Sequence, residues 1–215
     1  MQHRARTQEQ KDFRRLQILE AAEQHFHEVG YEAFSMASLA KLAGVVKGTL
    51  YLYFKTREEV FLTLHTMSLV RWSHTFVDQL RPDMSDHDYA SGLYKTAIAD
   101  GSFVPLLIRL EHVIEHNVSM DSLIKSKRVF IERVDYIAEK TVPILTLTKT
   151  QAAELVRTMG VLLIGTSSTD QRPSLIGEVI PSDVQELVNL FSSETLFIKN
   201  ACRIIAGIRT EISET

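Results

Sequence analysis

The sequence predicts an all-α protein with a small N-terminal head and a larger helical body. Three observations support this fold class. The 215 residues include only nine glycines and five prolines. Few stretches alternate apolar and polar residues as strands do, and most of the chain repeats apolar residues at the spacing of amphipathic helices. Hydrophobic residues make up 45% of the chain and charged residues 24%, which is the balance of an ordinary globular protein.

The first helix is predicted over Phe13–Val29. Gly30 is expected to end it in a left-handed conformation, so that Tyr31 folds back onto the helix. Residues 1–12 are expected to be flexible. The apolar stripe of this helix recurs at three- and four-residue intervals and consists of Leu16, Leu19, Ala22, Phe26 and Val29.

Two short helices joined by a tight turn are predicted next. Ser35 is suited to cap a helix over Met36–Leu42, in which Leu39 and Leu42 are expected to face inward. A second helix is predicted from Lys47 to about Phe54. The crossing of a helix-turn-helix needs a small residue, a glycine in the turn and a buried anchor. Those three residue types are present as Ala40, Gly44 and Leu50. An ordinary helical hairpin is the alternative that this spacing leaves open.

The segments Leu19–Tyr31 and Ala43–Phe54 resemble the N-terminal domain of the TetR family of bacterial transcriptional regulators. The resemblance runs from about Arg15 to Phe61. It implies a double-stranded DNA operator as partner, a DNA-binding domain over residues 1–57, and a ligand-binding and dimerisation domain over residues 58–215. One position departs from the family pattern, because Val46 replaces the serine or threonine that usually caps the recognition helix.

The second short helix is expected to enter the major groove of DNA. Lys47 supplies a cation, Gly48 lets the backbone approach the duplex, and Thr49 offers a hydroxyl or a methyl group to a base. For Tyr51 and Tyr53, the alternative to DNA contact is that one of them packs inside the head. For Lys55 and Arg57, the alternative is that each is a solvated surface charge. The candidate DNA-binding residues are Ser35, Met36, Val46, Lys47, Gly48, Thr49, Tyr51, Tyr53, Lys55 and Arg57.

Six further helices are predicted in the body, and a long loop over Ser167–Pro181 separates the last two. The first of the six begins at a capping box of Thr56 and Glu59. The predicted ranges are Arg57–Leu80, Asp86–Asp100, Phe103–His116, Met120–Thr146, Thr150–Thr166 and Ser182–Ile208.

The middle helices are expected to enclose a cavity for a largely apolar small-molecule effector. Ordinary core packing is the alternative for each residue. His112 and His116 lie one helical turn apart, but no third ligand accompanies them, so neither a metal nor a cofactor is expected. The candidate ligand-binding residues are Trp72, Phe76, Tyr94, Phe103, Ile108, Arg109, His112, His116, Phe130 and Tyr136.

The last two helices are apolar on more than one face and therefore need a second burial partner. The resemblance implies that they pair with their copies in a homodimer; the alternative is a fully internal helix in a monomer. The candidate interface residues are Leu155, Met159, Leu162, Leu163, Leu187, Phe191, Ile198 and Ile205.

Composition and motifs exclude several other classes. Cys202 is the only cysteine, so no intrachain disulfide framework or cysteine-rich zinc site is possible. Residues 1–57 hold nine Lys/Arg against six Asp/Glu, whereas residues 58–215 hold fifteen against twenty-one, so a basic head precedes an acidic body. Basic residues near the N-terminus are not followed by an apolar segment, and the longest apolar run, Met159–Ile164, is too short to cross a bilayer. We expect a cytoplasmic protein without membrane contact.

The sequence predicts a dimeric repressor that a small-molecule effector releases from a palindromic operator. An activator, or an effector-independent DNA-binding protein of the same fold, would carry the same features. An enzyme is not expected, because the chain has no glycine-rich phosphate loop, no Gly-x-Ser-x-Gly elbow and no His-Glu-x-x-His motif.

Overall fold

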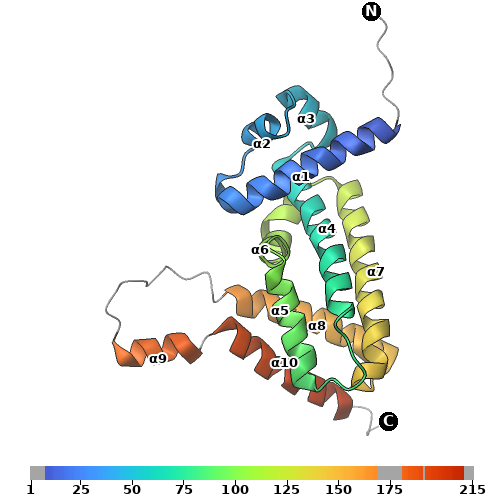
Figure 1. Cartoon of the computed structure of the whole chain (residues 1–215), viewed down its shortest axis with the longest axis vertical. Helices are drawn as coiled ribbons and strands as arrows, with labels where there is room; N and C mark the ends of the chain where they lie inside the picture. The colour runs from blue at the N-terminus through green and yellow to red at the C-terminus, as the bar shows by residue number, and fades with distance from the viewer. Residues whose placement is uncertain (1–7, 169–180, 191, 211–215) are drawn as a thin grey trace, which may run out of the picture.

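The computed structural model describes residues 8–168, 181–190 and 192–210, with the side chains of 187–189 excepted. All regular structure in these ranges is helical, which confirms the predicted fold class. The first three helices form a head at one end of an elongated body (Figure 1). No helix among the described residues combines the length and apolar character that a membrane crossing requires.

Helix α1 (Gln8–Ala33) bends at Gly30, where φ is 71° and ψ is −174°. This conformation is open to glycine and rarely to other residues. The bend turns Tyr31 back against Phe61, and their ring centroids lie 4.7 Å apart. Gly30 interrupts the helix with a positive φ as predicted, but its ψ is extended and not that of the predicted left-handed C-cap. Residues 8–12 are helical rather than flexible, and residues 1–7 lie outside the described ranges.

The predicted apolar stripe of α1 is wrong at its two ends. Leu16 and Val29 are 46% and 38% exposed. Helix α1 packs on α2 and α4, and these helices do not cover Leu16 or Val29 fully. The buried residues of the helix are Ile18, Leu19, Ala22, His25 and Phe26 before the bend and Tyr31 after it.

Helices α2 (Met36–Leu42) and α3 (Lys47–Tyr53) form the predicted helix-turn-helix. The hydroxyl of Ser35 caps α2 by accepting the amide N–H of Ser38 at 3.1 Å. Gly44 takes a φ of +62° in the turn, and Leu50 is fully buried. The inward orientation predicted for Leu42 is wrong: its side chain is 53% exposed, because the buried side of α2 is formed by residues one turn earlier.

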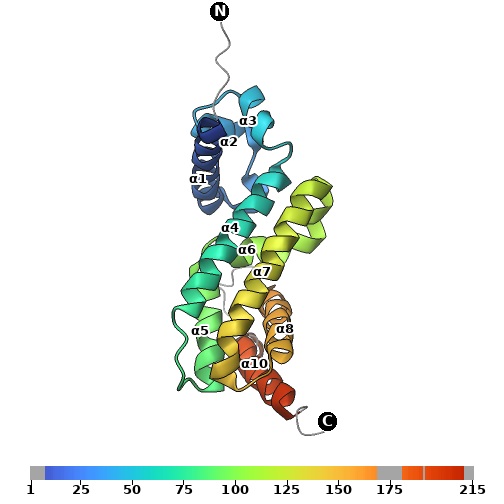
Figure 2. The same cartoon turned by 90° about the vertical axis from the view of Figure 1, so that its right-hand side faces the viewer.

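Helix α4 (Arg57–Val77) runs from the head into the body and packs along α7 (Met120–Leu145), as Figure 2 shows. Thr56 caps α4 by accepting the amide of Glu59 at 3.1 Å. Helices α5 (Asp86–Ala99) and α8 (Lys149–Ser167) complete the main body. The helix predicted over residues 103–116 is shorter: α6 spans Phe103–Arg109 and continues as a π turn over Leu110–Ile114 and a 3₁₀ turn over Glu115–Asn117.

The helix predicted over residues 182–208 is two helices, α9 (Ser182–Leu190) and α10 (Ser193–Thr210). Serine at 192 and 193 favours a new helix start over continuation. Helix α9 projects away from the body in Figure 1, whereas α10 packs between α5 and α8. Arg209 fixes the end of α10 through two 2.7 Å bonds to the carboxylate of Asp86 and one of 2.9 Å to the carbonyl of Leu145.

Candidate functional site

Helix α3 presents a row of side chains on the surface of the head. The ammonium of Lys47 lies 5.9 Å from the ring centroid of Tyr51, and Lys55 donates a 3.1 Å hydrogen bond to the carbonyl of Tyr51. Lys47 and Tyr51 are spaced four apart and follow one side of α3. Lys55 lies after the end of the helix, and its bond to the Tyr51 carbonyl places it at the end of this row. Lys47 and Lys55 are exposed, and Tyr51 and Tyr53 are half-buried. The arrangement places two cations and an aromatic ring on one face.

Backbone access accompanies this row. Gly48 is exposed, and a Cβ atom built there would meet nothing within 4 Å. Val46, at the start of the helix, is 73% exposed and makes no side-chain cap. The first amides of α3 therefore receive no side-chain acceptor from their own N-cap. Thr49, in the first turn, is half-buried.

Two of the predicted DNA-binding residues face elsewhere. Met36 is 8% exposed and belongs to the head core, so its side chain is not available for DNA. The guanidinium of Arg57 lies 4.6 Å from the ring centroid of Tyr31 and pairs with Glu58 at 3.1 Å. Arg57 therefore fastens α4 to the head. Ser35 is exposed, but its hydroxyl is already engaged with Ser38 at 2.7 Å.

A groove between α1 and the end of α3 contains residues that the candidate set did not include. Leu52 is 76% exposed on α3 and lines this groove of about 480 Å³ with Lys11 and Arg15. Lys11 and Arg15 belong to the basic N-terminal segment that the charge pattern of the sequence already indicated. Leu52 carried no such signal, because apolar residues in a helix are ordinarily assigned to the core.

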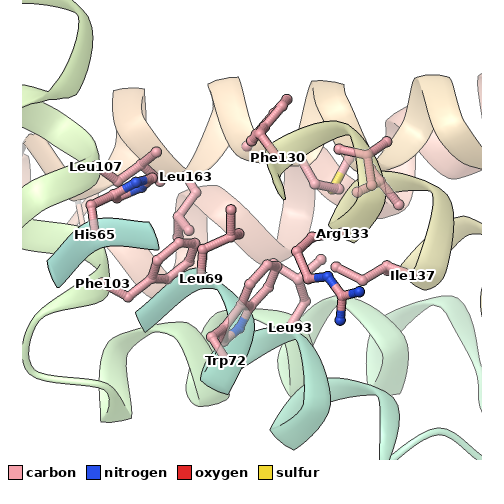
Figure 3. A pocket seen from close by; sticks show the side chains of 14 residues that line it. His65, Leu69, Trp72, Leu93, Phe103, Leu107, Phe130, Arg133, Ile137 and Leu163 are labelled. Atoms are coloured by element: carbon pink, nitrogen blue, oxygen red, sulfur yellow. The ribbon is translucent and has the colours of Figure 1, made fainter. Parts of the chain in front are cut away.

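A cavity of about 50 Å³ lies inside the body, where α4, α5, α6, α7 and α8 meet (Figure 3). All but two of its described lining residues are apolar or glycine; the exceptions are His65 and Arg133. The lining residues are His65, Leu69, Trp72, Leu93, Phe103, Leu107, Phe130, Arg133, Val134, Ile137, Val156, Met159, Gly160 and Leu163.

His65 is a buried polar group of this wall. Its side chain is 2% exposed, and neither ring nitrogen has a hydrogen-bond partner among the described residues. The ring stacks on Phe103 with centroids 5.9 Å apart. Burial, aided by the positive charge of Lys127, lowers the pKa of His65 to about 4. The imidazole is therefore neutral at pH 7 and presents one donor and one acceptor.

Arg133 is the charged group of the wall. Its Nε is buried and has no acceptor in the part of the chain that the structure describes. Its guanidinium lies 5.0 Å from the ring centroid of Tyr136, and one terminal nitrogen is 3.4 Å from Nε2 of His74. Within the described ranges, no carboxylate forms an ion pair with Arg133.

The structure brings Trp72, Phe103 and Phe130 of the predicted ligand set into the cavity wall. The others lie elsewhere. Phe76 packs behind Trp72 with centroids 5.9 Å apart, and the hydroxyl of Tyr94 bonds that of Ser193, so both belong to the core. Tyr136 contacts His74 with centroids 5.2 Å apart.

The remaining predicted ligand residues lie on and after α6. Arg109 points to the head, 5.2 Å from the ring centroid of Tyr31, and its neighbour Ile108 does not line the cavity. His112 and His116 are exposed. The described residues contain no group of three His, Cys, Asp or Glu side chains that could hold a metal ion.

The predicted ligand set did not include His65 and Arg133, because it was chosen mainly from aromatic residues. Their helices did carry a signal: His65, Leu69 and Trp72 are spaced by four and three residues, so they share one face of α4. The predicted set could therefore have been extended along this face from Trp72 to His65. Arg133 similarly lies three residues after Phe130 on α7.

A polar network connects the cavity to the head. Phe103 stacks on Trp72 with centroids 4.6 Å apart, and the preceding residue, Ser102, is fully buried. The Ser102 hydroxyl donates to Glu23 of α1 at 3.0 Å and lies 2.8 Å from Nε2 of His27. Because the hydroxyl proton is used on Glu23, His27 is the donor of the second bond. This α1–α6 network joins the recognition head to the cavity wall.

Arg71 of α4 and Asp100 complete the network. Arg71 bonds Glu23 at 2.7 Å and Asp100 at 2.8 Å, and Asp100 accepts the amides of Ser102 and Phe103 at 3.0 Å each. The backbone amide of Phe103 and the bonds from Ser102 to α1 therefore belong to one hydrogen-bond network.

Four predicted dimer residues are core residues of their own chain. Leu155, Met159, Leu163 and Ile205 are at most 1% exposed, because α8 and α10 pack on each other and on α5 and α7. Leu162 and Ile198 are partly exposed. The side chain of Leu187 and the whole of Phe191 lie outside the described residues.

The comparisons with known proteins cover both parts of the chain. Residues 18–64 match the model for bacterial regulatory proteins of the tetR family, and residues 67–211 match that for the tetracyclin repressor-like C-terminal domain. The HTH-type transcriptional regulator YhgD of Bacillus subtilis (strain 168) is 39% identical over 71 residues, which are 33% of this chain and 37% of YhgD. The fatty acid metabolism regulator protein of the same organism is 32% identical over 77 residues, which are 36% of this chain and 38% of that protein. The chain thus matches little more than a third of the length of these curated relatives.

Solved structures share the fold over nearly the whole chain. A TetR variant from Acinetobacter baumannii AYE, in complex with minocycline, has a TM-score of 0.58 at 17% identity and covers 94% of this chain and 95% of its own. Thermus thermophilus FadR, in complex with lauroyl-CoA, has a TM-score of 0.57 at 15% identity, with coverage of 89% and 93%. The two family models together span most of the sequence. The chain belongs to the TetR family of bacterial transcriptional regulators.

Proposed function

We propose that the protein is a homodimeric repressor that binds a palindromic operator through α3 and leaves it when a small-molecule effector enters the body cavity. The row Lys47–Tyr51–Lys55 beside Gly48 is the observation that carries the DNA-binding part. We assign residues 1–57 to the DNA-binding domain and residues 58–215 to effector binding and dimerisation.

On the operator, Lys47 and Lys55 bind phosphates or guanine acceptors, and the tyrosine hydroxyls of Tyr51 and Tyr53 reach phosphates. Gly48 lets the helix backbone approach the duplex, where Thr49 meets a base edge. The uncapped amides after Val46 can donate to a phosphate oxygen, which would replace the missing side-chain cap. Met36 and Arg57 are left out, because both side chains are engaged within the protein.

For the dimer, we assign the outer faces of α8 and α10. These faces carry Val161, which is 71% exposed, and the partly exposed Leu162, Ile198 and Cys202. A two-fold axis there would let two heads engage successive major grooves, about 34–36 Å apart. The inner faces of both helices are already buried in one chain.

Release follows from the α1–α6 network. A ligand larger than the 50 Å³ cavity must displace wall residues, and Phe103 adjoins Ser102, whose bonds hold α1. Such a ligand shifts the population away from the DNA-binding form only if it binds the other form more tightly. The small cavity volume also favours a second candidate function, a regulator of the same fold that binds DNA without an effector.

The test is a fluorescence-anisotropy titration against DNA from upstream of the protein's own gene, at two salt concentrations. We expect tight binding that weakens with salt, and affinity losses of about tenfold or more in Lys47→Ala and Tyr51→Ala. Lys149→Ala, an exposed lysine on α8, is the matched control and should bind like the wild type. Wild-type affinity in Lys47→Ala and Tyr51→Ala would contradict the assigned surface.

A further inference from the structure

The cavity wall contains two polar groups that the described residues do not fully satisfy. We propose that the effector is an elongated apolar carboxylic acid whose carboxylate binds Arg133 and whose far end carries an uncharged hydrogen-bonding group that binds His65. This inference rests on the proposed effector role of the cavity. It adds the chemical class of the ligand, which the apolar character of the wall alone does not define.

The carboxylate is inferred from Arg133. A buried guanidinium nitrogen is costly unless an acceptor meets it, and a carboxylate is the acceptor that matches guanidinium geometry best. Nε of Arg133 has no acceptor among the described residues, and none of their carboxylates contributes to the cavity lining. His74, at 3.4 Å from a terminal nitrogen, is a weak neutral neighbour. A ligand anion would complete this site.

The uncharged group is inferred from His65. A fully buried imidazole whose nitrogens both lack a partner among the described residues is unusual, because nearly all buried polar groups have one. A neutral ring offers one donor and one acceptor, so a hydroxyl, which has both functions, can pair with whichever ring nitrogen it meets. A second charged group at this end would be buried among Phe103, Leu107 and Leu163 without a counter-ion from the described lining.

The separation of the two groups requires an elongated molecule. Figure 3 places His65 and Arg133 at opposite ends of the wall, with Leu69, Trp72 and Phe103 between them. Arg133 contacts His74, which is nine residues after His65 on α4, and that interval is roughly 13 Å along the helix axis. The segment between the polar ends is lined by aromatic and aliphatic side chains and therefore suits hydrocarbon.

The wall also indicates where the additional volume comes from. A Cβ atom at Gly160, which lines the cavity, would meet nothing within 4 Å, so there is open space beside α8 at this position. Met159 beside it has a flexible side chain that adapts to irregular ligands. Cationic effectors are disfavoured, because the described lining holds Arg133 and no carboxylate, and Lys127 adds positive charge near His65.

Trp72 supplies a direct assay, since it is the only tryptophan of the chain and lines the cavity. Its emission is titrated with decanoate, ω-hydroxydecanoate and decylamine, which share a chain length but differ in charge and in the distal group. We expect decanoate to bind at least tenfold more tightly than decylamine. The ω-hydroxyl should add about fivefold.

Variants at Arg133 and His65 test which residue binds each end of the ligand. Arg133→Met keeps the apolar stem and should weaken decanoate at least tenfold, whereas Arg133→Lys should keep the preference for the acid over the amine. His65→Phe keeps a ring and should remove the gain from the ω-hydroxyl while leaving decanoate unchanged. Lys140→Met removes an exposed cation from the same helix as Arg133 and is the control. Circular dichroism verifies that each variant is folded.

The results separate this inference from the proposed function. Equal binding of acid and amine, unaltered decanoate binding in Arg133→Met, or no change of Trp72 emission with any probe would overturn the inference. The same probes are then added to the operator complex. Acids that bind at Trp72 but leave the DNA bound would overturn effector release and keep the ligand chemistry. Release of the DNA by decylamine and not by decanoate would overturn the ligand chemistry and keep effector release.

Discussion

Replacing the buried His65 with phenylalanine should remove a defined pH dependence of stability. The pKa of His65 falls from 6.5 in the unfolded chain to about 4 in the fold. Below pH 6.5 the unfolded chain therefore binds more protons than the folded one, so the free energy of unfolding decreases as the pH falls and levels off below about 4. At pH 4.5 the unfolded imidazole is almost fully protonated and the folded one only about one-quarter. This difference lowers wild-type stability by about 2–3 kcal/mol relative to pH 7.5.

The measurement is urea unfolding of both proteins at equal concentration, at pH 7.5 and 4.5. Other titrating groups are shared, so they cancel in the difference between the two proteins. From pH 7.5 to 4.5, the free energy of unfolding of His65→Phe should rise by about 2–3 kcal/mol relative to that of the wild type. His112→Gln, at an exposed histidine, is the matched control and should show no such gain. If the free energies of unfolding of His65→Phe and the wild type change equally between the two pH values, then His65 is not a buried neutral imidazole in the folded protein.

Three further predictions concern the head and its connection to the cavity. Val46→Thr keeps the shape of the side chain and adds the hydroxyl that α3 lacks as a cap, so thermal unfolding should show a gain of about 1 kcal/mol; an unchanged melting temperature would mean that the amides are satisfied otherwise. Leu50→Ala removes a fully buried anchor and should cost about 2–5 kcal/mol in urea unfolding, whereas a loss below about 1 kcal/mol would show that the head does not depend on it. Ser102→Ala removes the hydroxyl shared by Glu23 and His27. It should reduce the ratio of DNA affinities measured without and with saturating ω-hydroxydecanoate by about fivefold or more, and an unchanged ratio would place the coupling elsewhere.

The head was predicted well because short-range signals determine it. A serine cap, a glycine at positive φ and a buried leucine at fixed spacing defined α2, the turn and α3. The errors at Leu16 and Leu42 have a common cause. Both lie toward an end of the helix predicted for them, where the neighbouring element decides whether a residue is covered, and periodicity along one helix does not contain that information.

The body was predicted less completely because its contacts are long-range. The apolar surplus of α8 and α10 was real, but α5 and α7 cover much of it within one chain, as the burial of Met159 and Ile205 shows. The cavity depends on how five helices converge. Selecting aromatic residues found Trp72 and Phe103 but could not separate them from Phe76, which stacks on Trp72 from the same helix and does not line the cavity.

The cavity wall begins at His65, and no described residue of the head contributes to it. Under the proposed function, substitutions that alter ligand preference can therefore accumulate in the body while the surface proposed to contact bases stays constant, and the reverse also holds. Helix α4 is the shared part, with its first turns against the head and its middle turns in the wall. Exchanging the chain before this helix should transfer operator preference to another body, provided that Glu23 and His27 are retained to meet Ser102. Under the proposed function, ligand preference and operator preference would thus be adjusted in separate parts of the chain.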